Sequence, residues 1–176
     1  TITGQSVEEQ VDQLLLALDS FKSDYQFVFI GSNSDTHSDV IFTKVKSYTD
    51  ENRFAFFTSV KPEEYLALIK YSKGLIGNSS SGLLEAPSLQ VGTVNIGKRQ
   101  EGRVRGESVI DVESNRQSIE QGIQHLLSDD FQKRLPTMVN PYYQDNSAEK
   151  AYGLIKAFLA SESGNKPKRF YDLENK

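Results

Sequence analysis

Short apolar runs alternate with amphipathic helical segments along this chain, and this alternation limits the folds it can adopt. The strands are expected at residues 25–30, 53–57, 74–77, 93–96 and 108–112. A run as apolar as YQFVFI, which precedes Gly31, is typical of a strand buried on both faces. The alternation predicts an α/β fold with a doubly wound, mostly parallel sheet and right-handed crossovers.

Helix starts are marked by capping residues in the first half of the chain. Ser6 and Glu9 have the spacing of a capping box, and apolar residues then recur at helical intervals as far as Phe21. Proline fits the first position of a helix, so Pro62 predicts a helix that runs to about Tyr71. A further helix is expected over residues 39–48, and a short one ends near residue 88.

The second half of the chain predicts two more helices. Ser114 is the expected N-cap of a helix that runs to residue 127. Asn146 and Glu149 repeat the capping-box spacing before a helix over residues 148–159. We therefore expect one α/β domain over residues 1–160, followed by a polar C-terminal tail over residues 161–176.

Composition and motif content exclude several classes of function. The formal net charge of −4 disfavours nonspecific nucleic-acid binding, which needs surplus Lys and Arg to neutralise phosphates. The chain has no cysteine for a disulfide or thiolate metal site, and we expect a cytoplasmic protein. No apolar run approaches the roughly 20 residues of a membrane span, so no membrane association is expected. The glycine-rich Rossmann fingerprint is missing, and neither a cofactor nor a metal is expected.

The segment GLIGNSSSGLLEAP, residues 74–87, is the most informative stretch. A helix start offers backbone N–H groups to a phosphate, and Ser79, Ser80 and Ser81 can add hydroxyl donors. Gly82 lets the backbone approach a ligand closely. Glu85 lies about one turn further on, where a carboxylate can accept hydrogen bonds from a ribose diol. The alternative is that the serines cap the helix and Glu85 complements its dipole.

Two other loops follow expected strands. GKRQEGRVRG, residues 97–106, carries Arg99, Arg103 and Arg105, whose guanidinium groups suit phosphate, although a solvated basic loop is the simpler reading. Asn33 follows the first strand and can bond a base or a sugar, and nearby His37 has no evident metal partners. Ligands of open α/β sheets bind at the carboxyl ends of strands, so these loops and the serine-rich segment are expected to converge.

The run GNSSSGLLEAPSLQVGTVNIGKRQEGR, with Asn140-Pro141-Tyr142 and a terminal FYDL, resembles hydrolysing UDP-N-acetylglucosamine 2-epimerases. The resemblance covers nearly the whole chain, and residues 77–103 are its most specific part. It implies the two-domain glycosyltransferase-B architecture, in which a Rossmann-like C-terminal domain holds most of the nucleotide. This chain matches that C-terminal domain.

The resemblance also implies roles for individual residues. Ser79 and Ser80 match hydroxyls that contact the diphosphate, and Glu85 matches the acid that binds the ribose. Arg99 matches the arginine of a loop beside the nucleotide. The full set of implied nucleotide-binding positions is Asn33, Val60 (through its backbone, at the uracil), Ser79, Ser80, Ser81, Gly82, Glu85, Arg99 and Arg103.

The implied reaction converts UDP-GlcNAc and water into N-acetylmannosamine and UDP, in sialic-acid or capsule pathways. The family's catalytic carboxylates lie in an N-terminal domain, and its active-site histidine lies at the domain junction. We therefore expect no catalytic residue in this chain and no turnover by it alone. The expected partners are UDP, UDP-GlcNAc and that missing N-terminal domain, and a homo-oligomer is possible.

Other readings stay open at this point. The chain can be the donor-binding half of a UDP-sugar glycosyltransferase, or a non-catalytic module that senses nucleotide sugars. A third reading is an interaction domain that binds no nucleotide. Within the epimerase reading, a diacetamido sugar can replace GlcNAc as substrate.

Overall fold

The computed structural model describes residues 6–31, 38–52 and 54–161 of the 176-residue chain. The chain divides into two compact units, Thr1–Pro141 and Tyr142–Lys176. The first unit contains every strand that the structure describes, together with α1 to α6. The second contains α7.

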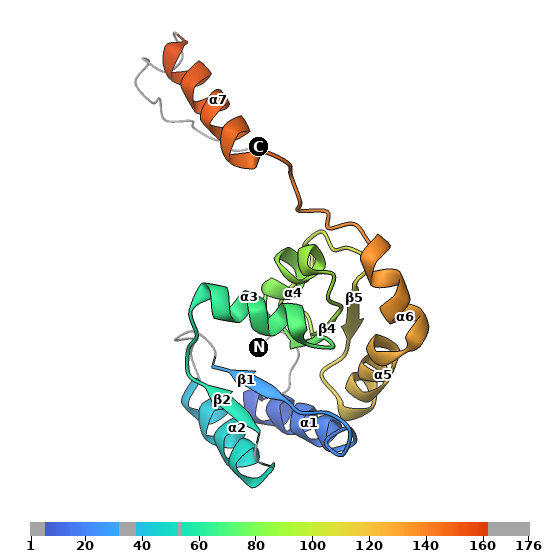
Figure 1. The fold of residues 1–176 in the computed structure, drawn as a ribbon. Helices are drawn as coiled ribbons and strands as arrows, with labels where there is room; N and C mark the ends of the chain where they lie inside the picture. The colour runs from blue at the N-terminus through green and yellow to red at the C-terminus, as the bar shows by residue number, and fades with distance from the viewer. Residues whose placement is uncertain (1–5, 32–37, 53, 162–176) are drawn as a thin grey trace, which may run out of the picture. The chain divides into compact units, whose positions relative to one another are not determined.

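The strands of the first unit (Figure 1) form two sheets, and within each sheet the paired strands are parallel. They are β1 Val28–Ile30, β2 Ala55–Phe57, β3 Leu75–Gly77, β4 Thr93–Ile96 and β5 Val109–Val112. Their hydrogen bonds form a two-stranded sheet, β1-β2, and a three-stranded sheet, β3-β4-β5. The predicted α/β class with parallel strands is confirmed, and each strand lies within its expected range.

Helices fill most of the intervals between strands. They are α1 Val7–Asp19, α2 Ser38–Asn52, α3 Pro62–Tyr71, α4 Ser81–Leu84, α5 Arg116–Leu127, α6 Asp129–Arg134 and α7 Ser147–Ala160, with 3-10 turns η1 Ala86–Leu89 and η2 Leu135–Thr137. The expected capping box of α1 is confirmed. The N–H of Glu9 donates to Ser6 Oγ at 3.1 Å, and the N–H of Ser6 donates to Glu9 Oε2 at 2.8 Å.

One predicted N-cap is wrong, and one predicted capping box does not form. The N-cap of α5 is Asn115, whose Oδ1 accepts from the N–H of Ser118 at 2.9 Å, while Ser114 is buried just outside the helix. Asn and Ser cap helices about equally well, so residue type alone does not fix which of two neighbours takes the position. Asn146 has a left-handed backbone (φ 53°) and makes no side-chain capping bond to α7. A capping side chain works from an extended backbone, which Asn146 does not have.

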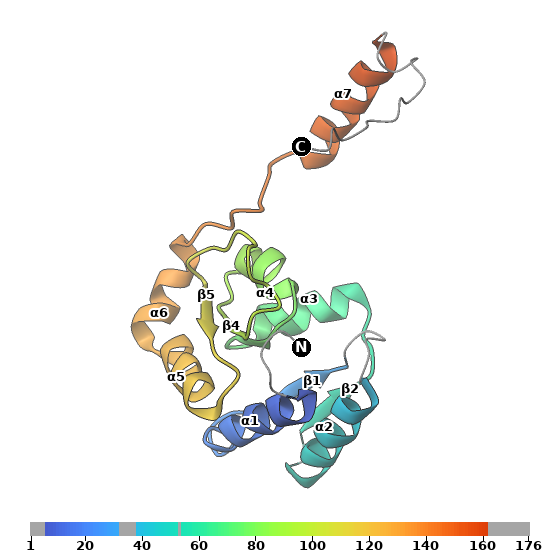
Figure 2. The same cartoon turned by 180° about the vertical axis from the view of Figure 1, so that it is seen from behind.

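The main hydrophobic core of the first unit brings both sheets together. Val94 of β4 and Ile119 of α5 are fully buried in it, beside Ala17 of α1. Phe29 of β1 and Ile76 of β3 pack against the same cluster. Figure 1 and Figure 2 show α5 beside β4 and β5, and α1 between α5 and α2. The two sheets therefore share one core and one set of covering helices.

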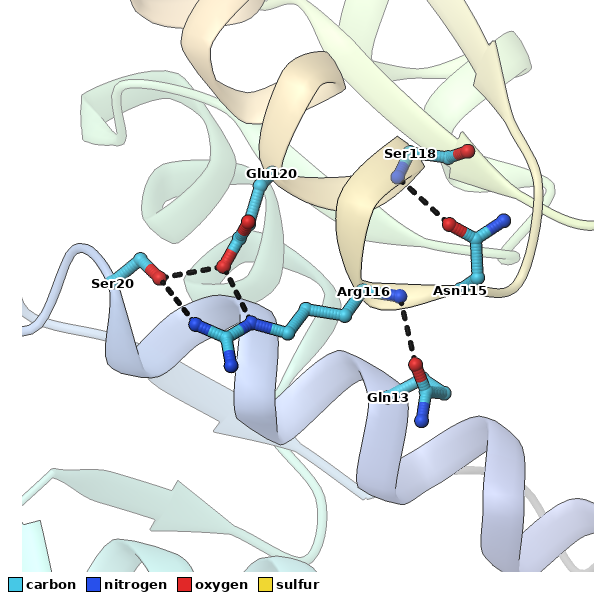
Figure 3. A network of polar contacts seen from close by, with 6 residues as sticks. All are labelled: Gln13, Ser20, Asn115, Arg116, Ser118 and Glu120. Atoms are coloured by element: carbon cyan, nitrogen blue, oxygen red, sulfur yellow. Dashed lines mark hydrogen bonds and ion pairs between the residues drawn. The ribbon is translucent and has the colours of Figure 1, made fainter.

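A polar network joins α1 to the start of α5 (Figure 3). Glu120 Oε1 accepts from Ser20 Oγ at 2.6 Å and from Arg116 Nε at 2.8 Å. The N–H of Arg116 donates to Gln13 Oε1 at 2.9 Å. The hydrogen bonds from Ser20 and then Arg116 hold the pKa of Glu120 below its usual range. This network fixes helices that cover the sheets.

The second unit presents an apolar helix to solvent. None of the residues of α7 is buried, and its large side chains Tyr152, Leu154, Ile155, Phe158 and Leu159 are exposed. Among the described residues, no helix has both the length and the apolar character that a membrane span requires.

Candidate functional site

The turn after β3 and the loop after β4 are tied together directly. Gln100 Nε2 donates to the backbone carbonyl of Asn78 at 2.7 Å, and Arg99 Nη1 donates to Asn78 Oδ1 at 3.5 Å. Gln100 is only 4% exposed, so water competes little for its hydrogen bond. The expected convergence of these two loops is confirmed. The third expected loop, with Asn33 and His37, lies outside the described residues.

The serine turn, residues 78–82, forms hydrogen bonds between its own residues. Gly77 takes a φ of +144°, which favours glycine, where the chain leaves β3. Ser79 Oγ accepts from the N–H of Ser81 at 3.3 Å, and the N–H of Gly82 donates to the Ser79 carbonyl at 3.2 Å. Ser79 therefore caps the turn in this structure. Its hydroxyl bond is long, and a phosphate oxygen makes a stronger, charge-assisted partner for the same N–H group.

Gly82 has a packing reason for being glycine. A Cβ built on it would lie 2.4 Å from Thr93 Cγ2 of β4, which is closer than real carbon atoms approach. Thr93 Oγ1 also donates to the Gly82 carbonyl at 3.1 Å. The close backbone approach expected at Gly82 is therefore an approach to β4. This contact packs α4 against the sheet, and the neighbouring Leu83 is fully buried.

Glu85 lies at the junction between α4 and η1. Its N–H donates to the Ser81 carbonyl at 3.0 Å, and the residue as a whole is half-buried. Its Oε2 atom is buried and has no hydrogen-bond partner among the described residues. A buried acceptor without a donor is costly, and the terminal torsion of a Glu side chain is soft. A small rotation would let this carboxylate accept a hydrogen bond from a ligand.

Asn140 contacts the backbone before Glu85 and a side chain after it. Its Nδ2 donates to the Leu84 carbonyl at 2.9 Å and to Ser88 Oγ at 2.6 Å. The side chain reaches α4 from the segment after η2, and Asn140 is only 8% exposed. Reasoning from residue types gave Asn140 no role. Its place in the resemblance to a known family was the only signal.

The arginines of the basic loop differ in their surroundings. Arg99 and Arg103 are exposed, as a phosphate-binding role requires. Arg105 instead pairs with Asp111 through Nη1 and donates from Nη2 to the Gln100 carbonyl at 2.6 Å. Asp111 also accepts from Asn95 Nδ2 at 2.7 Å, so β4 and β5 both hold this arginine. Arg105 therefore braces the loop, a role that its sequence did not distinguish from that of Arg99.

The remaining candidates lie apart from these contacts. Val60 is half-buried in the connection between β2 and α3. His125 is exposed on α5, with its ring centroid 5.0 Å from that of Phe131. Within the described part of the chain, no group of three or more His, Cys, Asp or Glu side chains could hold a metal ion.

Comparison with known proteins identifies the family of this chain. The sequence model of the family described as UDP-N-acetylglucosamine 2-epimerase matches residues 1–156. Polysialic acid biosynthesis protein P7 of Escherichia coli is 49% identical over 173 residues, which cover 98% of this chain and 44% of that protein. GDP/UDP-N,N'-diacetylbacillosamine 2-epimerase (hydrolyzing) of Campylobacter jejuni is 32% identical over 76% of this chain and 34% of that protein.

The fold is found in solved structures as well. The S. aureus MnaA-UDP co-structure matches 94% of this chain and 45% of its own chain with a TM-score of 0.68, at 18% sequence identity. The chain thus spans less than half the length of each of these three proteins. Because the family model covers most of its residues, this chain belongs to the UDP-N-acetylglucosamine 2-epimerase family.

Proposed function

We propose that this chain is the UDP-binding part of a hydrolysing UDP-GlcNAc 2-epimerase and that it binds both UDP and UDP-GlcNAc. The observation that carries the proposal is the hydrogen bond from Gln100 to Asn78. It brings the serine turn and the basic loop together in a member of this family. The serine turn, which offers donors to a diphosphate, leads into α4, and the acid proposed for a ribose is the C-cap of that helix.

Each end of the nucleotide has its own proposed residues. Ser79 and Ser80 offer hydroxyls to the diphosphate, and Arg99 and Arg103 offer guanidinium groups. Glu85 accepts from the ribose diol, which supplies the donor that its buried oxygen lacks. The full proposed site also contains Asn33, Val60, Ser81 and Gly82, all of which follow strands or begin α4.

The proposed contribution to catalysis is electrostatic. Cleavage of the anomeric C–O bond of UDP-GlcNAc builds negative charge on the departing UDP. Arg99 and the N–H groups of the serine turn would stabilise that charge more strongly in the transition state than in the substrate. UDP leaves C1 and a base removes the C2 proton to give a glycal-like intermediate, and water then adds its hydroxyl at C1 while a proton is delivered to C2 with inversion, to give N-acetylmannosamine.

We also propose that this chain binds nucleotide without turning it over. Proton transfer at C1 and C2 needs positioned acid and base groups, and these are proposed to lie in a second domain. Closure of such a domain would also exclude water from the reacting sugar. The span of only 44% of the E. coli relative's length supports this division of roles.

The family match favours the epimerase over a glycosyltransferase. The identity of the sugar is a separate matter, since the C. jejuni relative is named for a diacetylated bacillosamine. Product analysis of a full-length protein that contains this chain would decide both points. We expect free N-acetylmannosamine from UDP-GlcNAc, and a transferred sugar or a released diacetamido sugar would replace this proposal.

Calorimetric titration of this chain tests the binding proposal. We expect saturable binding of UDP in preference to ADP, and about tenfold or greater weakening in Glu85→Ala, because hydrogen bonds to charged groups are strong. Glu8→Ala removes an exposed acid from α1 and is the matched control. Equal binding of UDP and ADP, or no effect of Glu85→Ala, would reject the proposed site. Detectable epimerase activity of the chain alone would reject the division of roles.

A further inference from the structure

Asn140 reaches across the fold to the two residues that flank Glu85. Its side-chain amide donates to the Leu84 carbonyl, one residue before Glu85, and to Ser88 Oγ, three residues after it. The first of these contacts joins positions 56 apart in the sequence. Asn140 therefore holds the short segment that carries the proposed ribose acid from both ends.

The backbone needs this support because the segment is short and changes geometry at Glu85. The α-helix α4 has only four residues, and the 3-10 turn η1 begins directly after Glu85 (φ −96°, ψ −48°). The last carbonyl groups of a helix lack partners within it. Asn140 supplies a donor to one of them at the residue where the two geometries meet. Loss of that donor would let the junction shift.

We propose that Asn140 is a positioning residue that fixes the direction of the Glu85 carboxylate and thereby the preference of the site for a ribose diol. This inference rests on the proposed binding of UDP. The Glu85 carboxylate has a buried oxygen without a partner, so its own hydrogen bonds do not fully determine its direction. Its position therefore depends on the backbone, which Asn140 holds at the Leu84 carbonyl and, through the hydroxyl of Ser88, supports after Glu85.

A merely structural asparagine would behave differently from a positioning one. Loss of a structural contact lowers stability and weakens every ligand alike. Loss of a positioning contact changes the interaction made by one group, which here is the ribose hydroxyl. The comparison of UDP with 2′-deoxy-UDP isolates that hydroxyl, because the two ligands share their base and diphosphate.

The experiment is a double-mutant cycle between Asn140→Ala and Glu85→Ala, with UDP and 2′-deoxy-UDP titrated against each variant of this chain. We expect Asn140→Ala to weaken UDP about five- to tenfold, and 2′-deoxy-UDP less than twofold. In the Glu85→Ala background, Asn140→Ala should have no further effect on either ligand.

Asn115→Ala is the matched control, because Asn115 also bonds a helix backbone at 2.9 Å but belongs to α5. It should lower the melting temperature and leave the ratio of the two affinities unchanged. Ser88→Ala removes the contact between Asn140 and the Ser88 hydroxyl without emptying a buried position. It keeps the test available if Asn140→Ala fails to fold. We expect Ser88→Ala to lower the ratio of the UDP affinity to the 2′-deoxy-UDP affinity two- to threefold.

The outcomes separate the two proposals. If the unmodified chain binds UDP and Asn140→Ala weakens both ligands equally, the positioning role is wrong while the UDP site stands. The same holds if the two substitutions are additive, or if neither Asn140→Ala nor Ser88→Ala changes the ratio. Failure of the unmodified chain to bind UDP would reject the proposed function and the inference together.

Discussion

Gln100 Nε2 donates to the carbonyl oxygen of Asn78 at 2.7 Å and joins the loop after β4 to the turn after β3. The bond runs between positions 22 apart in the sequence and is partly buried, with Gln100 only 4% exposed. It places the exposed Arg99 beside a turn that carries three serines. This contact joins the two described loops that carry the candidate site.

Substitution of Gln100 should lower both stability and UDP affinity. Gln100→Glu keeps the shape of the side chain but replaces the donor with a carboxylate that faces the Asn78 carbonyl. We expect a loss of about 1–3 kcal/mol in the free energy of unfolding, measured by urea denaturation. Gln124→Glu, on the exposed face of α5, is the control and should change stability little. Unchanged stability of Gln100→Glu would show that the loop does not depend on this bond.

Arg103 and Arg105 should separate ligand binding from loop support. Arg105→Ala removes partners of Asp111 and of the Gln100 carbonyl, so we expect a lower melting temperature. Arg103→Ala should leave the melting temperature unchanged but weaken UDP, with a smaller salt dependence of the affinity. Thermal unfolding and titrations at two salt concentrations measure both effects. The reverse pattern would exchange the roles given to the two arginines.

Gly82→Ala should lower stability unless the facing side chain of β4 is made smaller. The added Cβ would lie 2.4 Å from Thr93 Cγ2, and overpacking of this kind costs about 1–3 kcal/mol. Thr93→Ser removes that methyl group and keeps the hydroxyl that donates to the Gly82 carbonyl. We expect Thr93→Ser to recover part of the stability that Gly82→Ala loses. Additive losses in the double variant would contradict the proposed contact.

Acid should weaken the contact between α1 and α5. The hydrogen bonds from Ser20 and Arg116 hold the pKa of Glu120 below its unfolded value of 4.5. The stabilisation of the folded state by ionised Glu120 is therefore fully present above about pH 4.5. It is lost as the pH falls through the lower pKa that Glu120 has in the folded state. Ser20→Ala removes the first of these bonds, so we expect a smaller fall in stability on acidification. Unfolding curves at pH 6 and about pH 3.5 measure the loss of stability between these pH values. An equal loss in Ser20→Ala and the unmodified chain would contradict this role for Ser20.

Local signals in the sequence predicted much of the fold. The Ser6–Glu9 capping box, the start of α3 at Pro62 and both ends of β4 agree with expectation. Such features depend on the intrinsic preferences of adjacent residues and on hydrophobic periodicity. Where two neighbours had equal preference, as Ser114 and Asn115 did, the sequence could not choose between them. The segment 128–137, with α6 and η2, gave no prediction, because short helices carry too little periodicity.

The sequence by itself determined the α/β class, the order of strands and helices, and the two loops that carry candidate ligand groups. Tertiary structure alone decided which polar side chains face a ligand and which hold the protein together. Arg105 supports the basic loop because the fold places it next to Asp111 of β5. Asn140 bonds the Leu84 carbonyl because the fold brings together two positions that are 56 apart in the sequence. The physical reason is that hydrogen bonds between distant positions depend on packing distances, which no local preference encodes.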